Sequence, residues 1–162
     1  MGVSTNVDVA GFSLGSREIM SLLPHRYPFL LLDRVTECVP GVRISGIKNV
    51  TSAQPDVREF RGELRASPLM LIESLAQLSV VLTFRTLGIV ATGKELFFFA
   101  GIDQARFDGG VRVGETVVLS SKITRLMRTR GVGIFATEAT VNGRMVAEAT
   151  LMAALQVSAQ GA

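Results

Sequence analysis

Apolar positions along the chain alternate or cluster in a way that predicts strands on both sides of one helix. The stretches 29–39 and 42–50 are rich in large apolar and β-branched residues, and Pro40-Gly41 between them is a turn signal. This pattern predicts a β-hairpin. A short helix is expected before it, capped by Ser16 and running to Leu23.

A second, longer helix is predicted in the middle of the chain. Ser67-Pro68 supplies an N-cap and a first-turn proline, and Gly88 is a suitable C-cap. Residues 69–86 are apolar on nearly every side of this helix. A helix that is hydrophobic all round has to be enclosed by other elements.

The last third of the chain predicts only strands. Asn142-Gly143 is a strong signal for a two-residue hairpin turn. An antiparallel sheet of about six strands wrapped around the long helix, an α+β fold, would cover the helix and use every strand. The β-rich stretches are 96–102, 116–126, 132–141 and 145–157.

The remaining segments divide the chain into one domain with two tails. Residues 1–15 are small and polar without a period and are expected to form a flexible leader, and residues 158–162 a flexible tail. Residues 51–66 show neither a period of 2 nor one of 3.6, so a long loop is predicted there. Loops of this length in a compact domain are often functional. The folded domain is therefore placed at residues 16–157.

Composition favours a single cytoplasmic domain. The chain has 162 residues, of which 48% are hydrophobic and 19% charged, enough apolar surface for a core. The one cysteine, Cys38, cannot form an internal disulfide, and the N-terminus lacks the features of a secretory signal. The longest apolar run is interrupted by polar residues and falls short of a membrane span.

The formal net charge of +3 conceals a basic cluster. A solvated strand and turn is one interpretation of it, and contact with an acidic protein partner is the other. Nucleic-acid binding is not expected, because interleaved aromatic residues and a recognisable helix motif are absent from the segment. The cluster consists of Lys122, Arg125, Arg128 and Arg130.

Glu73 is the strongest local indication of chemistry. It interrupts the apolar run of the long helix, and Gln77 lies four residues later on the same face. A buried carboxylate needs partners or a proton, which would tune it for catalysis, but a structural polar network between helix and loop explains it equally well. The free N–H groups at the start of the helix, around Pro68, could bind a thioester oxygen or a phosphate.

Other catalytic arrangements are not supported by the sequence. His25 is the only histidine, and it is expected to be a loop residue with a structural hydrogen bond. One histidine and one cysteine cannot make an ordinary zinc cluster or a Cys-His pair, so no metal is expected. Neither a serine-hydrolase motif nor a phosphate-binding glycine fingerprint is present.

Five segments, taken in order, resemble the FabZ and FabA type of 3-hydroxyacyl-acyl-carrier-protein dehydratase. The resemblance covers residues 16–157 without large gaps. Together the motifs are highly specific for the family, although each alone would be a weak indication. The segments are 22–34 (LLPHRYPFLLLDR), 48–51 (KNVT), 71–77 (LIESLAQ), 100–107 (AGIDQARF) and 146–149 (VAEA).

The resemblance implies a hotdog fold, a homodimer with a continuous sheet that is often a trimer of dimers, and an acyl tunnel at the dimer interface. It also implies an acyl substrate carried on the 4'-phosphopantetheine of an acyl carrier protein, with no other cofactor. In this family a loop histidine removes the C2 proton while a helix carboxylate from the other subunit helps the C3 hydroxyl leave. Glu73 matches the carboxylate. Residues implied to line the substrate site are Gln77, Phe60, Gly62, Ser67, Pro68 and Leu69.

The chain departs from the family pattern in the histidine loop. Where the family has Gly-His-Phe-Pro-Gly, residues 58–62 read Arg-Glu-Phe-Arg-Gly, so Glu59 replaces the catalytic histidine. His25 does not replace it by alignment, because family members carry the His25 motif as well. Glu59 and Glu73 could share a proton and act as a catalytic pair. However, an ion pair of Glu59 with Arg58 or Arg61 would keep it charged and weakly basic.

Three functions follow from this reasoning. The first is a dehydratase-like acyl-thioester-binding protein with an altered active site, in fatty-acid or polyketide-type synthesis. The second is a non-catalytic acyl-binding partner of an active paralogue that supplies the histidine. The third is a hotdog thioesterase in which Glu73 activates water. The basic cluster is the predicted contact for the acidic carrier protein.

Overall fold

The computed structural model describes residues 11–92 and 95–157, and these form a curved sheet around one long helix. The helices are α1 (Ser16–Leu22) and α2 (Pro68–Leu87), and a short 3-10 turn, η1 (Arg128–Arg130), follows later. The strands are β1 (Phe12–Leu14), β2 (Arg34–Val39), β3 (Arg43–Asn49), β4 (Arg58–Phe60), β5 (Glu63–Ala66), β6 (Glu95–Phe107), β7 (Val111–Arg112), β8 (Thr116–Met127), β9 (Val132–Val141) and β10 (Arg144–Val157).

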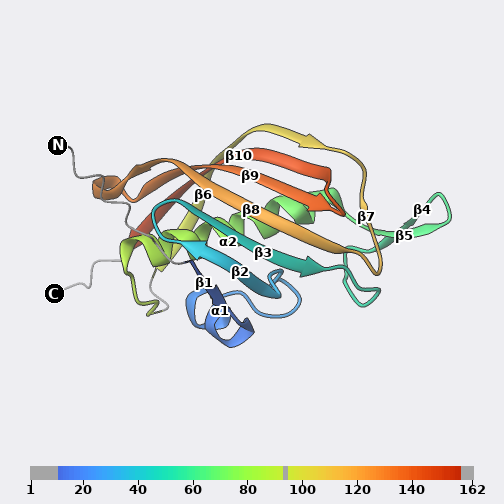
Figure 1. The fold of residues 1–162 in the computed structure, drawn as a ribbon, viewed down its shortest axis with the longest axis horizontal. Coiled ribbons are helices and arrows are strands. Elements are labelled where there is room, and N and C mark those ends of the chain that lie inside the picture. The colour runs from blue at the N-terminus through green and yellow to red at the C-terminus, as the bar shows by residue number, and fades with distance from the viewer. Residues whose placement is uncertain (1–10, 93–94, 158–162) are drawn as a thin grey trace, which may run out of the picture.

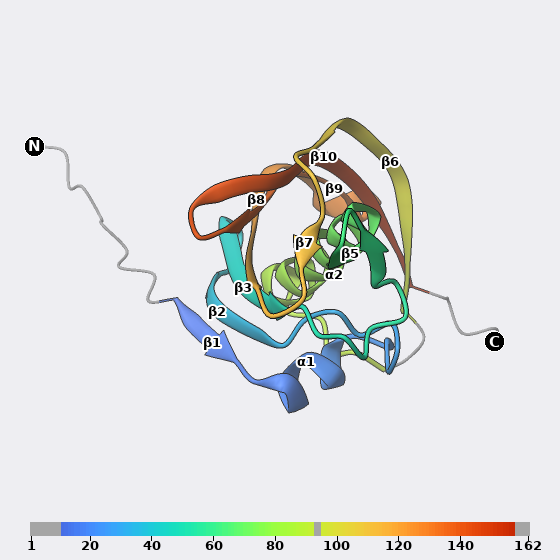
Figure 2. The same cartoon turned by 90° about the vertical axis from the view of Figure 1, so that its right-hand side faces the viewer.

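The main sheet has the strand order β1-β2-β3-β8-β9-β10-β6, with antiparallel pairing between all neighbours. It curls around α2, which the end-on view in Figure 2 shows enclosed by strands (Figure 1). The predicted hotdog arrangement is confirmed, with seven strands where about six were expected.

Helix α2 begins and ends where the sequence predicts. The Ser67 side chain accepts a hydrogen bond from the backbone N–H of Leu69, and Gly88 ends the helix in the left-handed conformation with φ of 64°. Leu71, Leu75, Leu78 and Leu82 form the buried stripe that faces the sheet, and they belong to the same core cluster as Leu119, Phe135 and Leu151.

By length and hydropathy alone α2 could cross a membrane, but 72% of the apolar window is buried inside the molecule, as in the core helix of a globular domain. Burial by the sheet therefore accounts for its apolar composition.

The N-terminal third differs from the prediction at three boundaries. Phe12–Leu14, expected in the leader, form β1 because Leu14 packs into the core and the strand pairs with β2. Gly15, not Ser16, is the N-cap of α1, and Glu18 Oε2 accepts from its backbone N–H at 2.8 Å. Strand β2 begins only at Arg34, because the preceding residues form a loop that packs over α2. The outer ends of the leader and tail, residues 1–10 and 158–162, lie outside the described residues.

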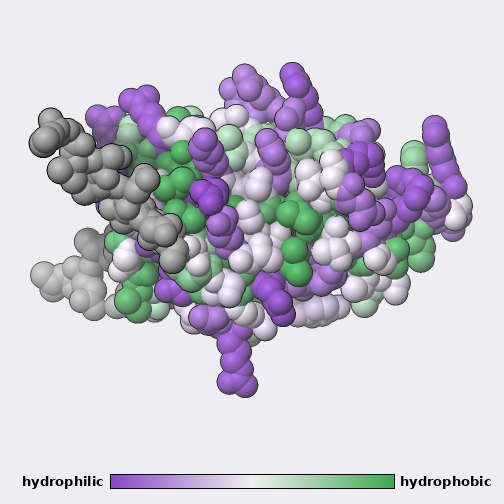
Figure 3. All heavy atoms as spheres, viewed as in Figure 1, coloured by the Kyte–Doolittle hydropathy of each residue, from purple (hydrophilic) through white to green (hydrophobic). Residues whose placement is uncertain are grey.

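Residues 51–66, predicted to be a loop throughout, contribute two strands to a second small sheet. Strands β4 and β5 form a hairpin, and β5 pairs with β7 in the order β4-β5-β7. We call this hairpin, residues 58–66, the arm. It projects from one end of the molecule in Figure 1, and Figure 3 shows mostly hydrophilic residues on the exposed face of that projection.

Candidate active site

Glu73 lies at the edge of the enclosed face of α2, where its carboxylate is accessible without being fully exposed. The exposed fraction of the side chain is 27%. Gln77 Nε2 donates a hydrogen bond to Glu73 Oε1 at 2.9 Å, which confirms the predicted pairing one helical turn apart. This bond fixes the direction in which the carboxylate points.

Gln77 joins the loop before β2 to the helix. Its side chain is fully buried, and its Oε1 accepts from the backbone N–H of Leu31 at 3.0 Å. Its Nε2 also donates to the carbonyl oxygen of Phe29 at 2.7 Å. One amide therefore satisfies two backbone groups of the loop and one carboxylate oxygen of the helix.

This loop brings His25 to Glu73, which the sequence did not predict. His25 Nε2 lies 3.6 Å from Glu73 Oε1. The expected structural hydrogen bond of the ring is wrong: the Nδ1 atom is buried and has no hydrogen-bond partner among the residues that the structure describes. The two residues are far apart in sequence. They come close because Gln77 holds the loop that carries His25 against α2.

Two adjoining cavities lead away from this pair. The smaller, about 130 Å³, is lined by His25, Glu73 and Gln77 together with apolar residues of α2, β6 and β10. The larger, about 340 Å³, shares His25, Val80 and Phe97 with it and is mainly apolar. The polar groups thus stand at one end of a largely apolar space, the arrangement needed to bind an apolar chain with a polar head.

The arm residues predicted for the site lie elsewhere. Glu59 and Phe60 are exposed on β4, and Glu59 does not line the cavities beside Glu73. Gly62 forms the tip of the arm with φ of 79°. The structure therefore does not bring Glu59 to Glu73 within one chain.

The expected ion pair of Glu59 with its flanking arginines is also wrong. Arg58 donates to the carbonyl oxygens of Pro55 and Val57, at 2.6 and 2.7 Å. The Arg61 guanidinium lies over the Phe60 ring, 5.3 Å from its centroid. Backbone carbonyls and an aromatic face therefore compete successfully with the carboxylate for these cations.

The predicted residues at the start of α2 line a third cavity of about 340 Å³ at the base of the arm. Ser67, Pro68 and Phe60 contribute to its wall. Leu69 is 69% exposed. The backbone N–H of Ser67 donates to Asp56 Oδ2 at 3.0 Å, so an acidic group already lies beside the helix start. This third cavity, which we call the notch, shares no lining residue with the two cavities beside Glu73.

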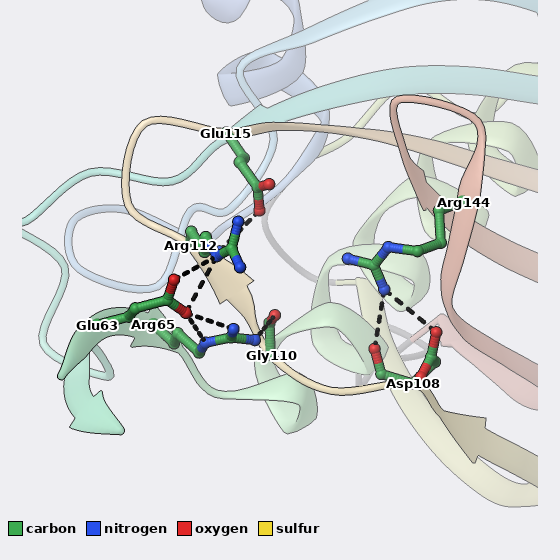
Figure 4. Close-up of polar contacts among 7 residues, drawn as sticks. All are labelled: Glu63, Arg65, Asp108, Gly110, Arg112, Glu115 and Arg144. Atoms are coloured by element: carbon green, nitrogen blue, oxygen red, sulfur yellow. Dashed lines mark hydrogen bonds and ion pairs between the residues drawn. The ribbon is translucent and has the colours of Figure 1, made fainter. Parts of the chain in front are cut away.

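A compensated charge network lies beside this notch (Figure 4). Glu63 accepts from both Arg65 and Arg112, and these hydrogen bonds, that of Arg65 first, hold the pKa of the Glu63 carboxyl below its ordinary value. Arg144 donates to the Asp108 carboxylate at 3.2 Å. Arg65, Arg112 and Arg144 therefore have acidic partners, in contrast to Arg58 and Arg61 on the arm.

The basic cluster at the end of β8 and in η1 is different. All four of its side chains are exposed, and none has an ion-pair partner in the part of the chain that the structure describes. It is therefore an uncompensated positive surface. Its members are Lys122, Arg125, Arg128 and Arg130.

Comparison with known proteins decides the family. A family model described as a FabA-like domain matches residues 23–150. The chain belongs to the FabA-like family. The family resemblance predicted from the motifs is confirmed.

Named members of this family are similar over nearly the whole chain. The 3-hydroxyacyl-[acyl-carrier-protein] dehydratase FabZ of Chromobacterium violaceum is 44% identical over 146 residues, covering 88% of this chain and 93% of that protein. FabZ of Haemophilus influenzae strain PittEE is 44% identical over 140 residues, covering 86% and 92%.

Solved structures agree on the fold. The dehydratase heterocomplex ApeI:P from Xenorhabdus doucetiae matches with a TM-score of 0.72 at 17% identity, covering 85% of this chain and 90% of that one. A hypothetical thioesterase protein with coenzyme A from Streptococcus pneumoniae matches with a TM-score of 0.58 at 10% identity, covering 76% and 85%. At these identities the likeness concerns the fold alone.

Proposed function

We propose that this chain is a 3-hydroxyacyl-acyl-carrier-protein dehydratase-like protein with an altered active site, acting on acyl-phosphopantetheine thioesters in fatty-acid or polyketide-type synthesis. The observation that carries the proposal is the Glu73 carboxylate, held by Gln77 at one end of a mainly apolar cavity. Similarity to FabZ proteins over most of the chain supports the substrate class. A cytoplasmic location remains a prediction.

Glu73 has the position needed to exchange a proton with a substrate. In the dehydration direction a protonated carboxyl can deliver its proton to the C3 oxygen, which leaves as water. Phe97 and Val80 offer apolar surface to the rest of the acyl chain. In this proposal the apolar cavity binds the acyl chain, and the Glu73 carboxyl group acts on the C3 oxygen at the polar end of the cavity.

Glu59 is the altered part of this proposed site. In the family the histidine of this loop reaches a carboxylate of the other subunit, and in this chain the same position carries an exposed carboxylate on a projecting arm. A carboxylate is a weaker base than a neutral imidazole near pH 7, and two adjacent carboxylates repel unless one is protonated. We therefore expect slow turnover compared with a histidine-bearing relative.

A homodimer would complete the site. Strand β6 is the last strand of the main sheet, and its outer edge pairs with no other strand in the described residues. Its exposed hydrophobic residues include Phe98, Phe99 and Ile102, and two of these also line the Glu73 cavity. Pairing of two β6 edges would continue the sheet, cover these residues and close the cavity. A trimer of such dimers is part of the same proposal.

The uncompensated basic cluster is proposed as the contact for the acyl carrier protein. Free exposed cations attract an acidic partner and accelerate its association. Reversing one of these charges, in Arg128→Glu, is expected to weaken carrier-protein binding at low salt about fivefold. The matched control is Arg65→Glu, because Arg65 already has an acidic partner. Equal loss in both variants would contradict this assignment.

The function is tested by mixing the purified protein with a 3-hydroxyacyl and a trans-2-enoyl carrier-protein thioester. Interconversion of the two and exchange of the hydroxyl oxygen with labelled water, without release of free thiol, are expected. Release of thiol would replace the proposal with the thioesterase function. If the protein neither interconverts the two thioesters nor binds the acyl thioester, the proposal is overturned.

A second function is favoured by the carboxylate of Glu59 at the position where the family has its histidine. Because one chain does not bring its arm to its own carboxylate, an arm from another family member could supply a histidine there. In this function the chain is the acyl-binding partner of an active paralogue. Mixed dimers with a histidine-bearing member would then turn over substrate. Glu73→Gln in this chain is expected to abolish this activity, and Glu59→Gln is expected to leave it unchanged.

A further inference from the structure

A hollow of about 420 Å³ lies beside the base of the arm and has no part in the proposed function. It shares no lining residue with the two cavities beside Glu73. Its wall comes from β5, β7, the loop before β7 and the turn between β9 and β10, and most of its polar residues are drawn in Figure 4. The polar side chains of the wall are those of Arg65, Arg112, Arg144, Asp108, Glu115 and Asn142.

Arg144, the first residue of β10, uses only one of its guanidinium nitrogens. Nη1 donates to the carbonyl oxygen and to the carboxylate Oδ2 of Asp108, both at 3.2 Å. Nε and Nη2 have no hydrogen-bond partner among residues 11–92 and 95–157. The N–H groups of Nε and Nη2 lie side by side on one edge of the planar guanidinium. Such an edge can donate two parallel hydrogen bonds to two oxygens of one ligand.

Arg112 on β7 presents a second free edge to the same hollow. Its Nε contacts both carboxylate oxygens of Glu63, at 3.0 and 3.1 Å. Nη1 and Nη2 have no hydrogen-bond partner in the part of the chain that the structure describes. Arg65 differs, because all three of its nitrogens donate, to Glu63 and to the carbonyl oxygen of Gly110. The hollow therefore has two guanidiniums with free edges and one that is fixed in place.

The two carboxylates of the wall compete weakly for these free edges. The formal charge of the lining is +1, from three arginines and two carboxylates, and Glu63 lies outside it. Glu115 accepts from the backbone N–H of Arg112 at 2.8 Å. The pair of Asp108 with Arg144 is exposed, with side chains 74% and 52% accessible, so solvent screens it. An incoming anion can therefore displace Asp108 from Arg144 at little cost.

Two glycines form a side of the hollow that carries no side chains. Gly109 has a φ of 71°, and its backbone N–H has no hydrogen-bond partner among the described residues. A Cβ at position 110 would lie 2.8 Å from the carbonyl oxygen of Ala66, so Gly110 leaves no room for a larger residue. Unpaired N–H groups in turns of this kind are a common feature of anion-binding concavities. The backbone thus adds a donor to the same space.

We propose that this hollow binds a small molecule that carries a phosphate monoester, held by the free edges of Arg112 and Arg144. A phosphate monoester has about two negative charges near pH 7 and three terminal oxygens, enough to accept from both edges at once. A carboxylate has two oxygens and one charge and satisfies a single edge. The volume of the hollow suits a small ligand rather than a protein surface. The site is independent of the proposed function.

The test titrates the full chain with methyl phosphate, the smallest phosphate monoester, by calorimetry at about pH 8 and low salt. We expect one saturable site per chain with a dissociation constant of about 1 mM. Methyl sulfate has the same shape and one negative charge, and it is expected to bind at least tenfold more weakly. Arg144→Gln and Arg112→Gln are each expected to weaken methyl phosphate binding at least tenfold. Arg144→Lys, which keeps the charge and loses the flat edge, is expected to recover only a small part.

Two control variants separate this site from general attraction of anions. Arg106→Gln removes an exposed arginine that also has a carboxylate partner, Glu148, but lies outside the hollow. Arg128→Gln removes a charge from the basic cluster. Both are expected to bind methyl phosphate within about twofold of the wild type, and circular dichroism checks that every variant is folded. Absence of saturable binding to the wild type, unchanged affinity in Arg144→Gln, or an equal loss in either control would overturn the proposal.

Discussion

Gln77 is the residue whose replacement tests most sharply how the site is assembled. We expect Gln77→Met to preserve the volume of the buried side chain while removing its three hydrogen bonds, to Leu31, Phe29 and Glu73. The loop that carries His25 would then lose its polar link to α2. The prediction is a loss of both stability and order at the site.

The size of the effect follows from the groups that lose their partners. The buried N–H of Leu31 would cost about 1–3 kcal/mol, and the carbonyl of Phe29 and the carboxylate of Glu73 would add about 1 kcal/mol more. The more apolar methionine offsets part of this. We expect a net loss of about 2–3 kcal/mol in the free energy of unfolding, or roughly 5–10 °C in melting temperature.

The measurement is urea unfolding at fixed protein concentration, followed by far-ultraviolet circular dichroism because the chain has no tryptophan. A change to methionine at an exposed helical position, Arg17→Met in α1, is the control and is expected to alter stability by less than about 0.5 kcal/mol. A loss below about 1 kcal/mol in Gln77→Met would refute the view that this amide joins loop and helix.

Two further predictions concern the core. Burial raises the pKa of the Cys38 thiol from its ordinary 9.0 to about 11, against a smaller lowering by Arg85. The unfolded thiol ionises first as pH rises, so stability should fall by about 3 kcal/mol between about pH 9 and 11, a slope that Cys38→Ala should lack in alkaline unfolding curves. A Cβ added to Gly46 would lie 2.8 Å from a backbone oxygen, whereas one on Gly101 meets nothing within 4 Å. Thermal unfolding should show a loss of about 1–3 kcal/mol for Gly46→Ala and little change for Gly101→Ala, and equal losses would contradict the packing described.

Local signals in the sequence were sufficient for the central helix and the last hairpin. Ser67-Pro68 and Gly88 set the ends of α2, and Asn142 and Gly143 both adopt positive φ in the turn between β9 and β10. These residues act through their own backbone conformation. Their effect can therefore be predicted without knowing the rest of the fold.

The parts that were missed depend on contacts between distant segments. Strands β4 and β7 have three and two residues, too short to show a period, and they exist because β5 pairs with both. The proximity of His25 to Glu73 depends on a loop held by Gln77, 46 residues away from Leu31 in sequence. Such a contact cannot be predicted from the sequence pattern of a single helix, strand or loop.

The central claim of the proposed function is that an acid-base site of the dehydratase type survives around Glu73, with Glu59 in the place of its histidine. The most direct measurement compares the rates of dehydration of a 3-hydroxyacyl carrier-protein thioester by the wild type, Glu59→His, and Glu59→His with Glu73→Gln. We expect the single variant to react at least tenfold faster than the wild type, and the double variant to lose that gain. No gain in the folded single variant, or a gain that persists without the Glu73 carboxylate, would contradict the account.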